Sequence, residues 1–98
     1  MIILNDPIEF AWDKGNKNKN WAKHKVSNEE AEQAFFDERR KTFSDKLHSG
    51  REERFRVVGK TEQGRLLFVT FTIRKSKVRI ISARDINRKE LNLYEETA

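Results

Sequence analysis

The feature that most constrains the fold is a run of three strand-like segments joined by very short turns. Apolar and polar residues alternate along residues 53–60, 65–73 and 77–83, with turns at Glu62-Gln63-Gly64 and Lys75-Ser76. Connections of two or three residues join antiparallel neighbours, because a parallel crossover needs a dozen residues or more. The sequence therefore predicts an antiparallel meander, with a weaker fourth strand at 41–43.

Helix signals lie on both sides of this meander. Ser27 and Glu30 form a capping box that opens a helix over 29–37, and Asn87 with Glu90 opens a closing helix. Ahead of these, the residues predict a short strand over Ile8–Trp12 and a helix over Lys14–His24 that Asp13 caps. We expect an α+β fold in one domain over residues 1–98, with 1–7 as an N-terminal extension.

The register of the meander follows from keeping apolar residues together, since a slip of one residue turns a strand over. The expected neighbours are Val57 with Val69, Phe55 with Phe71, Phe71 with Ile80, and Ile73 with Val78. The opposite face then carries Arg54, Arg56, Thr70, Thr72, Arg74 and Arg79. In this register Ser82 and Arg84 point toward the core.

Charge suggests the kind of partner. The chain has 21 Lys and Arg against 16 Asp and Glu, and residues 63–89 hold eight of the cations and a single acid, Asp85. A concentrated basic face is typical of proteins that bind polyanions, and guanidinium forks suit phosphate oxygens. The residues expected to contact such a polyanion are Lys23, Arg56, Thr72, Arg74 and Lys77.

Several functional classes are disfavoured. The chain has no cysteine and two histidines, so neither a disulfide nor a metal site is expected, and no cofactor is implied. No apolar run approaches the roughly 20 residues that span a bilayer, and the N-terminus does not resemble a signal peptide. We expect a cytoplasmic protein without a membrane partner.

Short motifs along residues 8–96 also resemble the BrnT toxins. The motifs are Trp12-Asp13-Lys14, Lys23-His24-Lys25-Val26-Ser27, Asp45 with His48-Ser49, Glu52-Glu53-Arg54, Val58-Gly59, Arg79-Ile80-Ile81-Ser82-Ala83-Arg84, and then Arg88, Glu90 and Tyr94. Each is weak alone, whereas their order and spacing are specific. One departure is Lys25, where the family usually has a glycine, at a position that suits a left-handed helix end.

The resemblance implies a RelE-like fold and the toxin half of a type II toxin–antitoxin pair. Such toxins are ribonucleases that block translation, and the implied partners are RNA and a BrnA-like antitoxin. RNA cleavage without a metal needs cations for the phosphate, a base for the 2′-hydroxyl and an acid for the leaving oxygen. The expected catalytic residues are Arg54, Arg79, Arg84 and His24.

The base and the function itself have alternatives at this point. His48 and Glu52 compete with His24 as the base, and Tyr94 is a candidate acid. A non-catalytic RNA- or DNA-binding module would use the same basic sheet face. A protein-interaction domain that docks an acidic partner is a third possibility, and a neighbouring antitoxin-like gene would favour the toxin.

Overall fold

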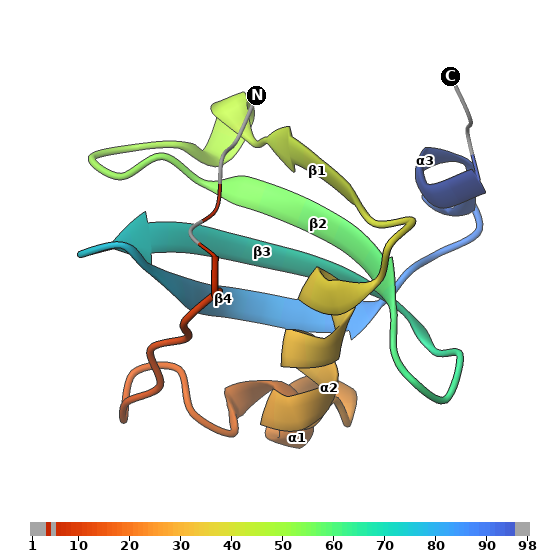
Figure 1. Cartoon of the computed structure of the whole chain (residues 1–98), viewed down its shortest axis with the longest axis horizontal. Helices are drawn as coiled ribbons and strands as arrows, with labels where there is room; N and C mark the ends of the chain where they lie inside the picture. The colour runs from red at the N-terminus through yellow and green to blue at the C-terminus, as the bar shows by residue number, and fades with distance from the viewer. Residues whose placement is uncertain (1–3, 5, 96–98) are drawn as a thin grey trace.

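The computed structural model describes residue 4 and residues 6–95. Four antiparallel strands form one sheet, with short helical elements before, within and after it (Figure 1). In chain order the elements are α1 (Lys19–His24), α2 (Asn28–Gln33), the 3-10 turn η1 (Ala34–Phe36), β1 (Lys41–Ser44), the 3-10 turn η2 (Lys46–His48), β2 (Phe55–Lys60), β3 (Leu66–Arg74), β4 (Lys77–Asp85) and α3 (Leu91–Glu95). The predicted α+β fold is confirmed.

The sheet is a simple meander with the strand order β1-β2-β3-β4. The predicted register is confirmed, because Val57 faces Val69, Phe71 lies between Phe55 and Ile80, and Ile73 faces Val78. Lys75 and Ser76 both have positive φ, which is the backbone of a two-residue hairpin turn whose twist matches the strands.

One irregularity changes the end of β4. Phe71 pairs with Ile80 whereas Thr70 pairs with Ser82, so Ile81 is an extra residue at a β-bulge. The bulge brings Ala83 opposite Val69 and Arg84 opposite Phe68. The prediction that Ser82 and Arg84 point toward the core is therefore wrong, because Ala83 takes the buried position, at 0% exposure.

The N-terminal segment lies along the free edge of β4 and is less regular than predicted. Instead of a strand over 8–12, the structure has one parallel bridge between Phe10 and Val78. The side chain of Asn16 donates to the carbonyl of Ile80 at 3.2 Å, and that of Asn20 accepts from the amide of Ala83 at 2.9 Å. These groups satisfy the backbone of an edge strand that would otherwise be open to pairing.

The first helix is shorter than predicted. Residues 14–18 form turns, and the Asp13 carboxylate accepts from the Gly15 amide instead of capping a helix. The helix ends at His24, and the next residue, Lys25, has a φ of 56° and a ψ of 36°, which are left-handed. This is the conformation for which a glycine is favoured.

The second helix keeps its predicted cap. The Ser27 hydroxyl accepts from the Glu30 amide and the Glu30 carboxylate accepts from the Ser27 amide, each at 3.0 Å. The α-helix ends at Gln33, and η1 continues it for one more turn.

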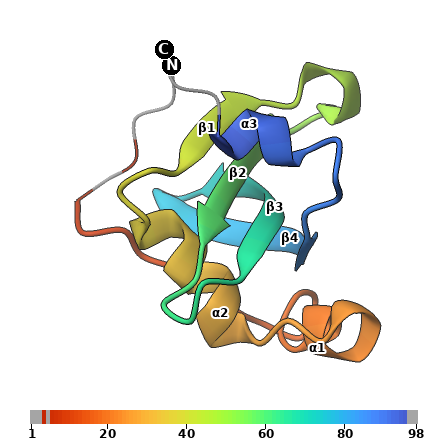
Figure 2. The ribbon, with the colours of Figure 1, turned by 90° about the vertical axis from the view of Figure 1, so that its right-hand side faces the viewer.

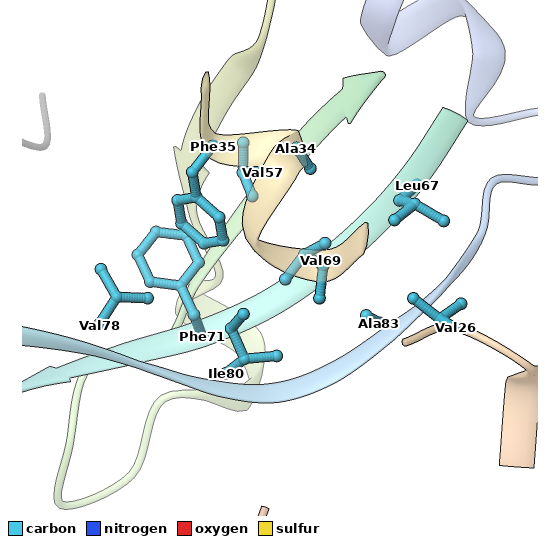
Figure 3. Close-up of a cluster of buried hydrophobic side chains, with 11 residues drawn as sticks. Val26, Ala34, Phe35, Val57, Leu67, Val69, Phe71, Val78, Ile80 and Ala83 are labelled. Carbon is cyan, nitrogen blue, oxygen red and sulfur yellow. The ribbon is translucent and has the colours of Figure 1, made fainter. Parts of the chain in front are cut away.

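The core lies between α2 with η1 and one face of the sheet (Figure 2). Phe35 of η1 packs edge-on against Phe71 at 4.9 Å between ring centroids, and Figure 3 shows the two rings side by side in the buried cluster. Leu67, Val69, Phe71 and Ile80 are each at most 1% exposed, as predicted. Within the described residues, no helix has the length and apolar character to cross a bilayer.

Candidate functional site

The face of the sheet opposite α2 is referred to below as the open face. Cross-strand pairing places its side chains in rows that run from strand to strand. One row holds Phe43, Arg56, Thr70 and Ser82; the next holds Lys41, Val58, Phe68 and Arg84; and Thr72 pairs with Arg79 in a third. The bulge in β4 thus brings Arg84 onto the same face as Arg56.

Phe68 is the centre of the open face. The guanidinium carbons of Arg56 and Arg84 lie 4.8 and 4.6 Å from the centroid of its ring, and Phe43 meets the ring edge-on at 6.4 Å. Stacking on an aromatic ring fixes the orientation of a planar guanidinium group and leaves its N–H donors at the rim. Two cations from β2 and β4 are therefore held over one apolar support.

Glu90, which follows β4 in the chain, forms a two-bond ion pair with Arg84. Its two oxygens accept from the two terminal nitrogens of Arg84 at 2.8 and 2.7 Å. This pairing raises the pKa of Arg84 and lowers the pKa of Glu90. The same carboxylate accepts from the amide of Asn87 at 2.9 Å, and the Asn87 side chain accepts from the amide of Glu90 at 2.8 Å, so the hydrogen bonds of the predicted capping box are present. The closing helix, predicted from Asn87, begins only at Leu91, because residues 88–90 form turns.

Asp45, at the end of β1, organises the neighbouring part of the face. Its carboxylate accepts from Nε of Arg56 at 3.0 Å and lies 3.0 and 3.1 Å from Nδ1 of His48. Burial raises the pKa of Asp45, but hydrogen bonds from His48 and the charge of Arg56 outweigh it, so the pKa is lowered overall. An ionised Asp45 favours the tautomer in which Nδ1 of His48 carries the proton and Nε2 is an acceptor.

The His48 side chain is 54% exposed, and within the described residues no group hydrogen-bonds its Nε2 atom. Its Nδ1 atom lies 3.4 Å from a terminal nitrogen of Arg56. An oriented imidazole with one free nitrogen beside the Arg56 guanidinium group can accept a proton from a hydroxyl group close to a bound phosphate.

The other open-face residues that the sequence predicts to bind phosphate are arranged differently from Arg56 and Arg84. Arg79 does face Thr72, but both its terminal nitrogens donate to Asp13, at 2.7 and 3.1 Å, and its side chain is only 16% exposed. Arg74 makes a similar two-bond pair with Glu52, and its side chain stays about half exposed. Arg54, which precedes β2, is exposed.

Thr72 was expected to contact RNA. Its hydroxyl donates to the carbonyl of Glu53 at 2.7 Å, and the residue is 2% exposed. In this conformation Thr72 stabilises the segment before β2, and the expectation of direct RNA contact does not fit its burial.

His24 and Arg79 are not brought together. The carbonyl of His24 accepts from Arg65 at 3.3 Å, and Arg65 also holds Asp85, at the end of β4. Arg79 lies six residues earlier on the same strand, which corresponds to roughly 20 Å. Lys77 is near Glu9, with Nζ 3.8 Å from its carboxylate, and Lys23 is exposed on α1.

A protein-family model matches most of this chain. The model of the BrnT family, described as the ribonuclease toxin BrnT of a type II toxin–antitoxin system, matches residues 12–90. The chain belongs to the BrnT toxin family. The match includes Asp45, His48, Arg56, Arg84 and Glu90. A search of curated proteins returns no match. As a family member, the chain is a ribonuclease toxin of a type II system, and such systems include an antitoxin protein.

Two residues of this BrnT toxin's open face were missed as site residues by reasoning from sequence. From the sequence, Asp45 is only one residue of a motif that resembles the family, and Glu90 is a residue of such a motif and a capping residue. The spacing of Asp45 and His48, three residues apart ahead of a strand, is the signal that would have pointed to their contact. Glu90 had no comparable signal, because its contact with Arg84 depends on the bulge.

Tyr94, the candidate acid, is hydrogen-bonded to a carboxylate in this BrnT toxin. Burial and a 2.6 Å hydrogen bond to Asp37 raise the pKa of Tyr94 to about 12, so its hydroxyl is a donor to Asp37 and a poor acid.

Among the residues that the structure describes, no group of three or more His, Asp and Glu side chains is placed to hold a metal ion.

Proposed function

We propose that this toxin is an endoribonuclease that cleaves RNA on the open face without a metal ion, and that this cleavage inhibits translation in the cytoplasm. The observation that carries the proposal is the pair Arg56 and Arg84 over Phe68, with His48 held beside Arg56 by Asp45. This cluster combines anion binding with an oriented proton acceptor, which are the two requirements of 2′-hydroxyl attack.

In the proposed reaction, the scissile phosphate binds to Arg56 and Arg84. Each guanidinium group has five N–H donors, so both keep donors for phosphate oxygens while paired with Asp45 and Glu90. Nε2 of His48 takes the proton of the 2′-hydroxyl as the 2′-oxygen attacks phosphorus. The bond to the 5′-oxygen breaks, water protonates that oxygen, and the products are a 2′,3′-cyclic phosphate and a 5′-hydroxyl end.

Arg54 and Arg79 are proposed to contact the phosphates of neighbouring nucleotides. Arg54 is exposed, whereas Arg79 is paired with Asp13 and must exchange that partner for phosphate. His24 stays a competing candidate for the base. It lies near Asp85, the last residue of β4, so a reaction at His24 would occur at a different place on the protein.

The chemistry is tested with purified toxin and a synthetic RNA, with and without EDTA. We expect cleavage that EDTA does not reduce, and products with cyclic phosphate and 5′-hydroxyl ends by mass spectrometry. Arg84→Gln should lower the rate by about 10²–10³, the usual loss for one donor to a developing oxyanion. Binding without cleavage would favour the non-catalytic RNA-binding module, and loss of activity in EDTA would contradict metal independence.

We also propose that the antitoxin is BrnA-like and covers the open face with an acidic segment. A carboxylate-rich segment would neutralise Arg54, Arg56 or Arg79 and exclude RNA from them at the same time. Association should slow as salt rises, because long-range attraction between exposed charges is screened. Salt-insensitive association that leaves these arginines accessible would mean that inhibition works at another surface.

A further inference from the structure

The segment that precedes and includes α1 is strongly cationic. Residues 14–25 hold five lysines and no acid, and all five lysines are exposed. They are Lys14, Lys17, Lys19, Lys23 and Lys25. This segment is called the lysine segment below.

The lysine segment differs from the open face in how its charge is used. Four arginines of the open face have internal partners: Arg56 with Asp45, Arg84 with Glu90, Arg74 with Glu52 and Arg79 with Asp13. Within the described residues, no carboxylate lies within 4 Å of an ammonium group of the lysine segment. Its charge is therefore available to attract a polyanion from solution.

An exposed aromatic ring lies among these cations. Trp21 is 52% exposed, and Nζ of Lys25 lies 5.5 Å from the centroid of its ring. Trp12 is a contrast, since its indole N–H donates to Glu32 at 2.6 Å and the residue is half-buried. Exposed aromatic rings beside lysines are the usual platform for single-stranded nucleic acids, because every base can stack on them.

The lysine segment is anchored next to the open face. The side chain of Asn20 accepts from the amide of Ala83, the residue before Arg84, at 2.9 Å. Arg65 donates to the carbonyl of Lys25 at 2.8 Å and fixes the end of the helix. In Figures 1 and 2, α1 flanks β4, the strand that carries Arg84. A strand of RNA that leaves Arg84 across the edge of β4 thus meets α1.

We propose that the lysine segment is a second RNA-binding surface, which binds phosphates of nucleotides flanking the cleaved one and stacks one base on Trp21. The ligand class is single-stranded RNA, and the assignment rests on the proposed function for the identity of that ligand. The surface increases affinity for long substrates and takes no part in the chemical step.

The phosphate contacts are tested with Lys17→Gln/Lys23→Gln and a non-cleavable 2′-O-methyl RNA of about 12 nucleotides, within the usual site size of single-strand binders. Each single-strand phosphate contact contributes about 0.7 to the salt slope, so the slope of log K against log salt should fall by about 1.4. At 0.1 M salt the same two contacts correspond to about 25-fold in affinity. Arg39→Gln/Lys89→Gln removes the same charge elsewhere and should change affinity less than threefold. Equal losses in the two double variants would overturn the proposal.

The stacking contact is tested at Trp21 itself. In a Trp12→Phe background, Trp21 is the only tryptophan, and its fluorescence should be quenched when the RNA binds. Trp21→Ala should weaken binding by about 5- to 150-fold, the range for losing one stacked base, and Trp21→Phe should recover most of it. An unquenched Trp21, or Trp21→Ala that binds as tightly as wild type, would overturn the stacking assignment.

A comparison of substrates separates this proposal from the proposed function. Lys17→Gln/Lys23→Gln should cleave a dinucleotide at the wild-type rate and show raised KM for the 12-nucleotide RNA. If no variant or wild type cleaves RNA, the proposed function fails while the binding assay still decides the lysine segment. If the double variant binds RNA normally and loses only affinity for an acidic antitoxin, the lysine segment is a protein interface and the proposal is wrong.

Discussion

Gly59 offers a direct test of how η1 packs on the sheet. A Cβ atom at Gly59 would lie 2.2 Å from the carbonyl oxygen of Ala34, and 2.9 and 3.0 Å from its C and Cα atoms. All three are backbone atoms of η1, so no side chain can turn aside. Because carbon–oxygen contacts settle near 3.4 Å, Gly59→Ala must lift η1 from β2 by about 1 Å.

The lift disturbs the centre of the core. Phe35 follows Ala34 and packs against Phe71, and all three residues are at most 1% exposed. Overpacking of a core typically costs about 1–3 kcal/mol, and loosened contacts of Phe35 add to it, so we expect Gly59→Ala to lose about 3 kcal/mol. For a domain of this size that lowers Tm by about 12–24 °C.

The assay is thermal and urea unfolding followed by circular dichroism, with Gly50→Ala as the matched control. A Cβ at Gly50 meets nothing within 4 Å, and its φ is not in the left-handed range. The control should be unchanged or gain up to about 1 kcal/mol through the unfolded chain. A Gly59→Ala protein within 1 kcal/mol of wild type would refute the close approach of η1 to β2.

Three further predictions concern the core, the end of α1 and acid. Phe71→Ala should lose about 3–5 kcal/mol in urea unfolding, since Phe71 is fully buried, and a loss under 1 kcal/mol would contradict its central place. Lys25→Gly should gain about 0.5–1 kcal/mol because Lys25 is left-handed, and a lower Tm would contradict that conformation. Because the pKa of Asp45 is lowered in the folded protein, its contribution is present above the ordinary value of about 4 and is lost as pH falls through the folded value. Urea titrations from pH 6 to pH 3 should therefore show a smaller loss of stability in Asp45→Asn than in wild type, and parallel losses would contradict the contact with His48.

The meander was predictable because its signals are local. The alternation of apolar and polar residues predicted which side of each strand is buried, and the two short turns predicted the hairpins. Only one register then paired Val57 with Val69 and Phe71 with Ile80. The capping box at Ser27 needs only two residues three apart. These features depend on near neighbours in the sequence, which is why reasoning from residues reached them.

The bulge and the N-terminal segment were not predictable in the same way. The bulge leaves Ile81 out of the pairing and brings Ala83 opposite Val69 in the core, and no local signal in the sequence marks that shift. In the N-terminal segment, Asn16 and Asn20 bond to β4, so the edge of the sheet determines their structure and intrinsic helix propensity does not.

The grouping of the candidate site residues could not be predicted for the same reason, because it depends on long-range contacts. Arg84 was placed on the wrong face because a single bulge reverses the strand beyond it. The contact of Asp45 with His48 joins a strand end to the following turn, and Glu90 reaches Arg84 only after the chain turns back at Asn87. The types of residue were visible in the sequence, but their grouping needed the tertiary structure.

The position of the base tests the central claim most directly, because the chain has two histidines and each marks a different place. The measurement is the single-turnover rate of RNA cleavage for His48→Gln and His24→Gln, at equal folded concentration. We predict that His48→Gln lowers the rate by about 10²–10⁴, the usual contribution of a general base, and that His24→Gln stays within about threefold of wild type. A large loss in His24→Gln with full activity in His48→Gln would contradict the assignment and move the reaction to the far end of β4.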